Sequence, residues 1–439
     1  MKPFPFLFCT LSFFTAAQAE PVEKSAASSS ESLSLGAVTQ AILASNPSIK
    51  EARARWEAAQ QRVPQARAWD DLKISADTRL ARFADVAANS FTDQMFSVEQ
   101  AIPISGRNQS RGRVATADAA QAFEDLRRNE LDTVAKARAA YFRLAKGYAL
   151  LDLLHANETS LQQSLEAERA KFEAGGQSQA TALAAENEVT KCEEMHRDLE
   201  RAISAEETQL KVLMNRDVFT ILGKPADLSR DRLPSSLNTE RLRVLALHHR
   251  PEVLMADLAV ASAAAKVELA KRDWIPDPSI TLEAQRYNGA SQGVSEVSAG
   301  VSFTVPWFNK AKYRAEEAEA AKTLEAARHA AESARNETVG LLRDHLSTVD
   351  TYHHHLELFD TQLIPKARQA VDATRLNFAS GKANLPDLLA SQRNLFELES
   401  TAREHLTDYE IALADLESLV GADLQLFPSS KATTNRRAK

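Results

Sequence analysis

The amino-acid sequence predicts a mainly α-helical protein with a membrane β component, built from two copies of a unit that reads helix, strand, strand, long helix, turn, helix. The first supporting observation is an internal duplication, because segments 131–217 and 342–423 carry matching residues 206 positions apart. The second is the helical spacing of apolar residues along these segments. The third is a pair of alternating apolar and polar stretches ahead of each segment, typical of strands. The matching pairs are Phe172 and Phe378, Gly175 and Gly381, Leu183 and Leu389, Leu210 and Leu416, and Asp217 and Asp423.

The composition favours long helices. Of 439 residues, only 13 are glycine and 15 are proline, so uninterrupted elements are expected. The formal net charge is −7, and the sequence has no basic patch with interleaved aromatic residues. We therefore expect no nucleic-acid partner.

Residues 1–19 have the pattern of a signal peptide. Lys2 supplies the charged start, residues 4–14 are a short apolar run, and Ala17-Gln18-Ala19 matches a cleavage site. Residues 20–34, rich in Ser, Ala and Glu, are predicted to be a flexible lead-in. Cys192 would then be the only cysteine of the mature chain, so no internal disulfide is expected.

Proline positions and changes of period divide the chain into two units. Pro47, after Asn46, is expected to start a second helix, because a proline inside a helix removes a backbone hydrogen bond. The predicted boundaries are 35–222 for the first unit, 223–238 for a linker, 239–427 for the second unit and 428–439 for a disordered tail. Strands are predicted at about 71–83, 91–102, 278–288 and 294–305, and arm tips at about 172–178 and 378–384.

The long helix of each arm must be solvated on one face. A helix from residue 107 to residue 172 would be roughly 100 Å long at about 1.5 Å per residue, which exceeds what a compact domain of this size can bury. The offset between the repeats grows from 203 at Pro103 and Pro306 to 206 at the tips. Three extra residues in a heptad-like pattern predict local overwinding of the second arm.

The four strands have about the length that a tilted strand needs to cross a bilayer. Four strands cannot close a barrel by themselves, and open edges in lipid would leave backbone amides and carbonyls unpaired. Closure therefore requires several copies of the chain. The alternative is a pair of soluble hairpins on a helical protein.

The duplicated pattern resembles the outer-membrane efflux protein (TolC) family over residues 35–427. The resemblance rests on Asn46-Pro47, on the strand-ending Pro103 and Pro306, and on a Phe-x-x-Gly motif at each arm tip. It implies a homotrimer, a β-barrel in outer-membrane lipid to which each protomer gives four strands, and an α-helical barrel across the periplasm. It also implies a periplasmic adaptor (membrane fusion) protein and an inner-membrane transporter as partners. We expect the transporter to be proton-driven, with an ATP-driven one as the alternative.

The segment Trp274-Ile275-Pro276-Asp277-Pro278 resembles the heavy-metal (CzcC-like) branch of that family. This resemblance implies an exit duct for heavy-metal cations. Two alternatives remain open. One is a duct for drugs or secreted polypeptides, and the other is a soluble periplasmic coiled-coil adaptor.

The resemblance also implies a gate at the arm tips. Asp387 matches the first of two acidic residues that line the closed tip in the family, Ala390 stands at the second place, and Ala383 replaces a latching arginine. We therefore expect one carboxylate ring and a weaker latch. Asp387 has a second interpretation, as an acid that favours a helix N-terminus after Pro386. The gate and tip candidates are Asp387, Phe172, Gly175, Phe378 and Gly381.

No catalytic or cofactor-binding motif is present, so neither an enzyme nor a cofactor is expected. The most tempting cluster is His353-His354-His355, with His345 nearby. Consecutive helical residues point about 100° apart, so these three side chains cannot converge on one metal ion. A solvated helix face is the favoured interpretation, and no metal site is predicted.

Overall fold

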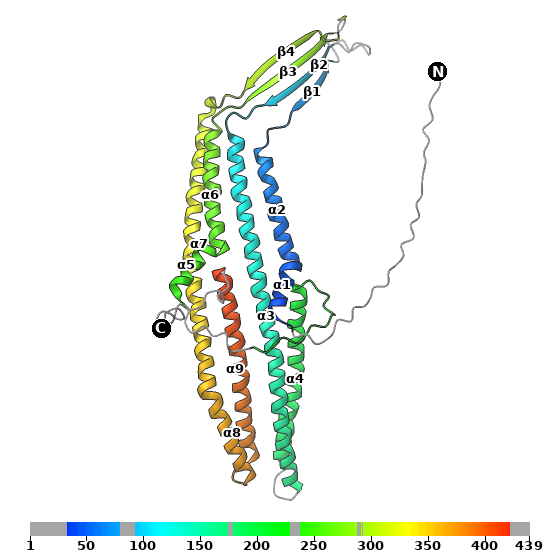
Figure 1. Ribbon diagram of the computed structural model, residues 1–439, viewed down its shortest axis with the longest axis vertical. Helices are drawn as coiled ribbons and strands as arrows, with labels where there is room; N and C mark the ends of the chain where they lie inside the picture. The colour runs from blue at the N-terminus through cyan, green and yellow to red at the C-terminus, as the bar shows by residue number, and fades with distance from the viewer. Residues whose placement is uncertain are drawn as a thin grey trace, which may run out of the picture.

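The computed structural model describes residues 33–79, 93–173, 179–228, 238–287, 291 and 293–421. In this part of the chain, long helices lie side by side, a four-stranded sheet extends from one end, and two helical hairpins form the other (Figure 1). The mainly α-helical architecture with a small strand component confirms the predicted fold class.

The first repeat begins with α1 (Leu35–Ser45) and α2 (Pro47–Arg67), which are separated by Asn46. The Asn46 Oδ1 accepts hydrogen bonds from the backbone N–H groups of Ser48 at 2.9 Å and Ile49 at 3.3 Å. Its Nδ2 donates to the Leu213 carbonyl at 2.8 Å, which ties this break to the end of the arm. Pro47 in the first turn of α2 needs no backbone donor there, as predicted. The arm consists of α3 (Arg107–Glu173) and α4 (Gln179–Leu213).

The second repeat follows the same order, and Pro251 begins α6 as Pro47 begins α2. A short 3₁₀ turn (Pro306–Asn309) leads from the last strand into the second arm. The helices are α5 (Thr239–His249), α6 (Pro251–Arg272), α7 (Lys310–Leu358), α8 (Ile364–Ala379) and α9 (Leu385–Val420).

The second arm contains a π turn, Phe359–Leu363, between α7 and α8. This turn lies within the stretch where the second repeat gains three residues. A π turn closes hydrogen bonds over five residues and is wider than an α turn. Pro365 follows it and has no N–H to donate to the Thr361 carbonyl, so regular α bonding is interrupted. The prediction of local overwinding is therefore wrong, because the structure widens the helix there.

Helix α3 is central to the packing. It contacts α2 and α4 on one side and α6 and α9 on the other, while α7 runs along α6 and α9 (Figure 1). One outer edge of this row of helices is therefore formed by α2 and α4, and the other by α7 and α8. Among the described residues, no helix is both long and apolar enough to cross a membrane.

The strands form one sheet with the order β1-β2-β3-β4, and every neighbouring pair is antiparallel. Pairing of β2 with β3 joins the two repeats, so the hairpins are not separate units. The strands are β1 (Lys73–Arg79), β2 (Asp93–Ala101), β3 (Pro278–Tyr287) and β4 (Glu296–Phe303). At its described end β1 begins at Lys73 rather than at residue 71, and β4 is two residues shorter than predicted at each end. The predicted strand residues 80–83, 91–92 and 288 lie outside the described residues.

Candidate functional site: the strand sheet and the arm tips

The sheet has one apolar and one polar face, because its register aligns residues of one kind across all four strands. Two rows on one face are mainly apolar: Ile74, Val98, Leu282 and Ala299, and Ala76, Phe96, Ala284 and Val297. The row between them on the opposite face is polar: Ser75, Ser97, Glu283 and Ser298. The hydroxyl oxygens of Ser75 and Ser97 lie 2.7 Å apart, which confirms that they share a face.

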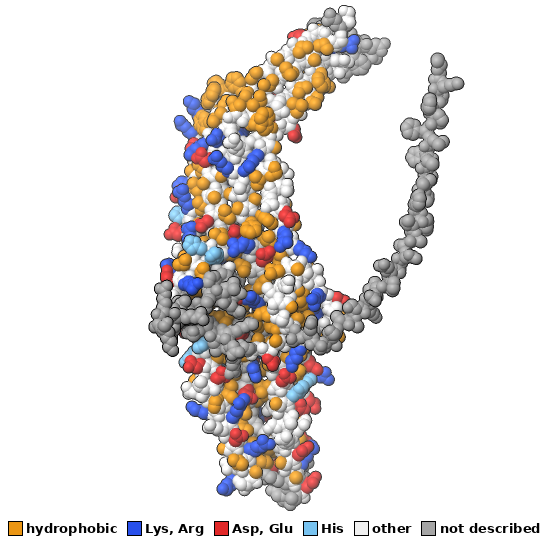
Figure 2. All heavy atoms as spheres, in the orientation of Figure 1, with side chains coloured by type: hydrophobic (Ala, Val, Ile, Leu, Met, Phe, Trp, Pro, Cys, Tyr) orange, Lys and Arg blue, Asp and Glu red, His pale blue; other side chains and the backbone are white. Residues whose placement is uncertain are grey.

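The apolar face is uncovered in the single chain. Phe96, Leu282 and Val297 are exposed, with Leu282 at 54%. Hydrophobic side chains gather over the strands in Figure 2. Soluble monomers rarely expose a contiguous apolar surface of this kind, and such a surface typically meets lipid or another protein.

Three of the four tryptophans lie where the sheet joins the helices. Trp69 precedes β1, Trp274 precedes β3, and Trp307 follows β4. Trp69 and Trp307 are exposed, while the Trp274 ring lies 5.4 Å from the Tyr313 ring. Tryptophan is enriched where a protein crosses the boundary between bilayer and water. The junction is therefore a candidate membrane boundary.

The segment 274–278 fixes this junction. Asp277 accepts hydrogen bonds from the Ser105 backbone N–H at 2.8 Å and the Ser105 hydroxyl at 2.9 Å. Arg272 donates to the Ser105 carbonyl at 2.9 Å, and Arg107 pairs with Asp273 at 2.8 Å. These contacts join the two repeats. The segment that suggests the heavy-metal branch therefore has a structural role here.

The tip of the second arm turns at Gly381. Its φ of +73° lies in the left-handed region that side chains disfavour, so glycine suits this position. The Lys382 and Ala383 N–H groups donate to the Asn377 carbonyl at 2.8 Å and 3.2 Å, which closes the end of α8.

Phe378 anchors the same turn from inside. Its side chain is 5% exposed and belongs to an apolar cluster with Leu385, Leu388 and Leu389 of α9. Leu154, Leu161, Leu165, Ala185 and Cys192 of the first arm complete this cluster, so the tips of both arms share one core. Phe378 and Gly381 thus shape the tip. In the first arm, Phe172 is part of α3, and Gly175 lies outside the described residues.

Asp387 is exposed in the first turn of α9 and forms a capping box with Asn384. The Asp387 N–H donates to Asn384 Oδ1 at 2.9 Å, and the Asn384 N–H donates to Asp387 Oδ2 at 3.4 Å. A carboxylate here also compensates the positive end of the helix dipole. The helix-start interpretation of Asp387 therefore describes its contacts, and its place in a gate stays a prediction.

The two arms are joined above the tip by an ion pair. Arg393 of α9 lies 2.7 Å from Glu188 of α4, which also accepts a hydrogen bond from Lys191 at 2.9 Å. Burial alone would raise the pKa of Glu188, but the bonds from Lys191 and Arg393 hold it below its ordinary value.

Two further polar contacts join the arms. Gln392 Nε2 donates to Ser160 Oγ at 2.9 Å and to Ser164 Oγ at 3.3 Å, and Gln392 is buried. Arg375 of α8 donates to Gln163 of α3 at 3.1 Å. Although Ala383 lacks a latching side chain, other residues fasten the arms. None of these partners stood out in the sequence, because nothing local indicates which helix faces meet.

The ion pair predicts a measurable coupling. In a double-mutant cycle of Glu188→Gln and Arg393→Ala, we expect a coupling free energy of about 0.5–1 kcal/mol, kept small because the half-exposed guanidinium is screened by water. Hydrogen exchange of the α4 and α9 amides near the tip would measure it. Arg197→Ala, which removes an exposed pair within α4, is the control. A coupling of zero would show that the pair does not hold the arms together.

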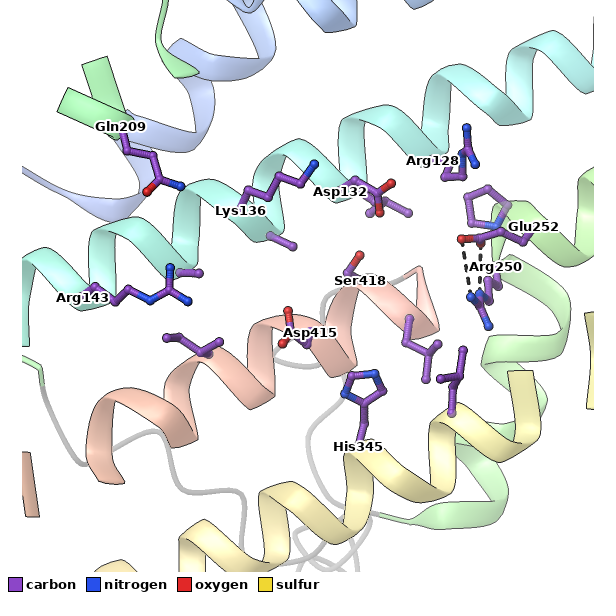
Figure 3. A pocket seen from close by; sticks show the side chains of 17 residues that line it. Arg128, Asp132, Lys136, Arg143, Gln209, Arg250, Glu252, His345, Asp415 and Ser418 are labelled. Carbon is purple, nitrogen blue, oxygen red and sulfur yellow. Dashed lines mark hydrogen bonds and ion pairs between the residues drawn. The ribbon is translucent and has the colours of Figure 1, made fainter. Parts of the chain in front are cut away.

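A polar pocket of about 420 Å³ lies midway along the helices, where α3 meets α9, α7 and the start of α6 (Figure 3). His345 of α7 points toward Asp415 of α9, and Arg143 of α3 lies on the far side (Figure 3). Burial raises the pKa of Asp415, against the opposing effects of His345 and Arg143. Arg250 donates to Glu252 at 3.0 Å. Among the described residues, no group of three or more His, Cys, Asp or Glu could hold a metal ion.

The raised pKa of Asp415 predicts a stabilising substitution. The folded state disfavours this charge, so its cost is present at neutral pH and is relieved as pH falls through the folded pKa. Asp415→Asn should raise the melting temperature at pH 7.5 by roughly 1–3 °C, the shift that about 1 kcal/mol produces in a long chain. Thermal unfolding would test this. A lower melting temperature would mean that the attraction of His345 and Arg143 outweighs burial.

The histidine run is only partly solvated. His354 is exposed, as predicted for a solvated face, but His353 and His355 are half-buried against α9. The His353 ring lies 6.3 Å from the Tyr409 ring, and the His355 ring lies 4.8 Å from that of His405. The solvated-face interpretation is therefore wrong for these two residues. His405 was missed, because its partner is far away in the sequence.

Each repeat of the chain matches a known protein family. The sequence model of the outer membrane efflux protein family matches residues 38–216 and 242–422, one match for each repeat. The chain belongs to this family. Members of the outer membrane efflux protein family are channels rather than enzymes, and they serve tripartite efflux systems in the outer membrane.

A curated protein and several solved structures are similar to this efflux protein. The alkaline protease secretion protein AprF of Pseudomonas aeruginosa is 23% identical over 353 residues, which cover 75% of this chain and 71% of AprF. The outer-membrane channel OprN is 18% identical with a TM-score of 0.77, over 89% of this chain and 90% of its own. CusC, described in terms of transmembrane channel formation, is 14% identical with a TM-score of 0.77, and the match covers 89% of this chain and 92% of CusC. These solved structures share the fold.

Proposed function

We propose that three copies of this chain form one passive exit duct through the outer membrane. The duct takes its cargo from an inner-membrane transporter, proton-driven, through a periplasmic adaptor protein, and the helices lie in the periplasm. The observation that carries this proposal is the four-stranded sheet of the described residues, which has one apolar face, one polar face and β1 and β4 as its edge strands. We assign no catalytic residue and no cofactor.

The need to close the open sheet into a barrel supports the proposed trimer. Strands β1 and β4 each leave one row of backbone groups without a partner strand in the described sheet, which is costly in lipid. Pairing β4 of one copy with β1 of the next is a head-to-tail contact. Such contacts close into a ring when the rotation between neighbouring copies brings the last copy back to the first. Three copies of four strands give twelve, an even number within the range of outer-membrane barrels. The apolar face then meets lipid, and the polar face lines a water-filled lumen.

The arm tips are the proposed docking and opening end. Phe378 and Gly381 shape the tip of the second arm, and Phe172 and Gly175 are assigned the same role in the first by their matching positions. Asp387 is exposed at the start of α9, and in a trimer it would supply one ring of three carboxylates. This ring favours cations over anions.

For the cargo we propose heavy-metal cations. The net charge of −7 and the resemblance of residues 274–278 to the heavy-metal branch support this choice, although the segment's contacts here are structural. The likeness to the alkaline protease secretion protein favours a secreted polypeptide as the second candidate. Deletion of the gene would separate these candidates. Metal cargo predicts sensitivity to metal salts with normal protein secretion, whereas polypeptide cargo predicts loss of a secreted protein with normal metal tolerance.

The cellular location of the protein can be tested independently of its cargo. We propose that residues 1–19 are removed as a signal peptide, so N-terminal sequencing of the mature protein should begin at Glu20. The purified oligomer should conduct ions across a planar bilayer. Recovery of the protein in the soluble periplasmic fraction would instead favour the coiled-coil adaptor alternative.

A further inference from the structure

Two histidines from different helices meet beside the π turn of the second arm. The His355 ring of α7 lies 4.8 Å from the His405 ring of α9, at an interplanar angle of 49°. The Nδ1 atoms of both rings are buried and have no hydrogen-bond partner among the described residues. A buried polar atom without a partner is costly, so this pair is a weak point in the α7–α9 contact.

Aromatic side chains surround the pair and connect it to the π turn. Phe359, the first residue of that turn, is buried and packs edge-on against His405 at 5.2 Å between centroids. Tyr352 lies 5.9 Å from His405. His405 thus packs directly on the residue where the α-helix gives way to a wider turn. A positive charge on His405 would therefore lie next to the π turn, where the α-helical hydrogen-bond pattern is interrupted.

The surroundings of His405 have opposing effects on the protonation of its ring. Glu404 and Asp408 of α9 favour the protonated ring, whereas burial and the neighbouring His355 of α7 disfavour it. Burial is the largest influence, and the net result is a pKa of His405 below its ordinary value. The other titratable group that contacts the pair is Tyr352 of α7, whose ring lies near both histidine rings.

We propose that His405 is a proton switch, and that its protonation separates α7 from α9 at the π turn and frees the lower part of the arm. Above about pH 6.5, the ordinary pKa of histidine, His405 is neutral in both the closed and the opened states and the contact is intact. Below that pH the opened state binds a proton more readily, so opening becomes more favourable as pH falls. This proposal rests on the packing of α7 and α9 and does not depend on the cargo.

The first arm provides an internal comparison. His155 of α3 and His196 of α4 are also paired, at 5.3 Å between centroids, but His155 is exposed and no π turn lies beside them. His196 additionally has Glu200 within 3.7 Å. Acid should therefore leave the first arm closed while it opens the second.

Hydrogen exchange of the full chain in detergent, with a metal chelator present, would test the switch. After correction for the intrinsic effect of pH, exchange in residues 352–363 and 402–409 should increase up to about 30-fold between pH 7.5 and 5.0. His405→Phe, which keeps a ring, should abolish the increase, and His354→Gln on the exposed side of α7 should keep it. His355→Gln should make the increase smaller, because without the opposing imidazole the closed state also binds a proton on His405 more readily.

The ratio of exchange at the two pH values is the readout, so a variant that is less stable at every pH still gives an answer. An equal increase in His405→Phe would overturn the proposal. So would an increase in His355→Gln that is as large as in the unmodified protein. An increase of the same size around His155 and His196 would also contradict it, because a general loosening by acid would then be responsible.

Discussion

Replacing Leu282 by arginine is expected to prevent the chain from forming channels in the outer membrane. Leu282 lies in the middle of the apolar face, with Val98 and Ala299 beside it in the register. A charge at the lipid-facing centre of a barrel costs about 2–4 kcal/mol, and three copies would incur it together, or roughly 6–12 kcal/mol per assembled barrel. Membrane fractionation and planar-bilayer conductance would measure the loss.

The matched control is the neighbouring residue on the other face. Thr281→Arg introduces the same side chain on the same strand, but in a row with Glu99 and Gly300 that should face water. This variant should assemble and conduct, with an altered preference for ions because the lumen gains positive charge. If both arginine variants assemble equally well, the apolar face does not meet lipid.

Truncating Phe378 to alanine is expected to unfold the tip of the second arm. Phe378 is almost fully buried and belongs to the cluster that both arms share. Removing a buried phenylalanine costs about 3–5 kcal/mol, which exceeds the strength of any single polar contact between the arms. The tip should then be cut by protease much faster and should lose its binding to the adaptor, while the sheet and upper helices stay intact.

Leu376→Ala serves as the comparison, because Leu376 lies on the same helix but is 72% exposed. This variant should resist protease like the unmodified protein. Equal protection of the Phe378→Ala tip would show that the turn is held by Gly381 and the Asn384 cap without the apolar cluster.

Local signals in the sequence predicted the elements well. The break at Asn46-Pro47 follows from one cap and one proline, and both act within a few residues. Alternation along β3 is likewise a property of the strand itself. At the second predicted tip, Gly381 does adopt the backbone conformation that a side chain would disfavour, whereas Gly175 of the first tip lies outside the described residues.

Contacts between distant segments could not be predicted. The pairing of β2 with β3, the ion pair of Glu188 with Arg393 and the meeting of His355 with His405 all depend on how helices and strands are placed in space. Helical spacing shows that a face is packed but does not say against which neighbour. The π turn was missed because an insertion of three residues can be absorbed by either a tighter or a wider helix.

Cross-linking of the two edge strands tests the central claim most directly. Cysteine would be placed at Ser75 of β1 and, in turn, at positions 296, 298, 300 and 302 of β4, in a Cys192→Ser background. In outer membranes, at least one combination should give a ladder of covalent products that ends at three copies. The absence of cross-links between copies in every combination, or a ladder that ends at another number, would contradict a barrel built from three chains.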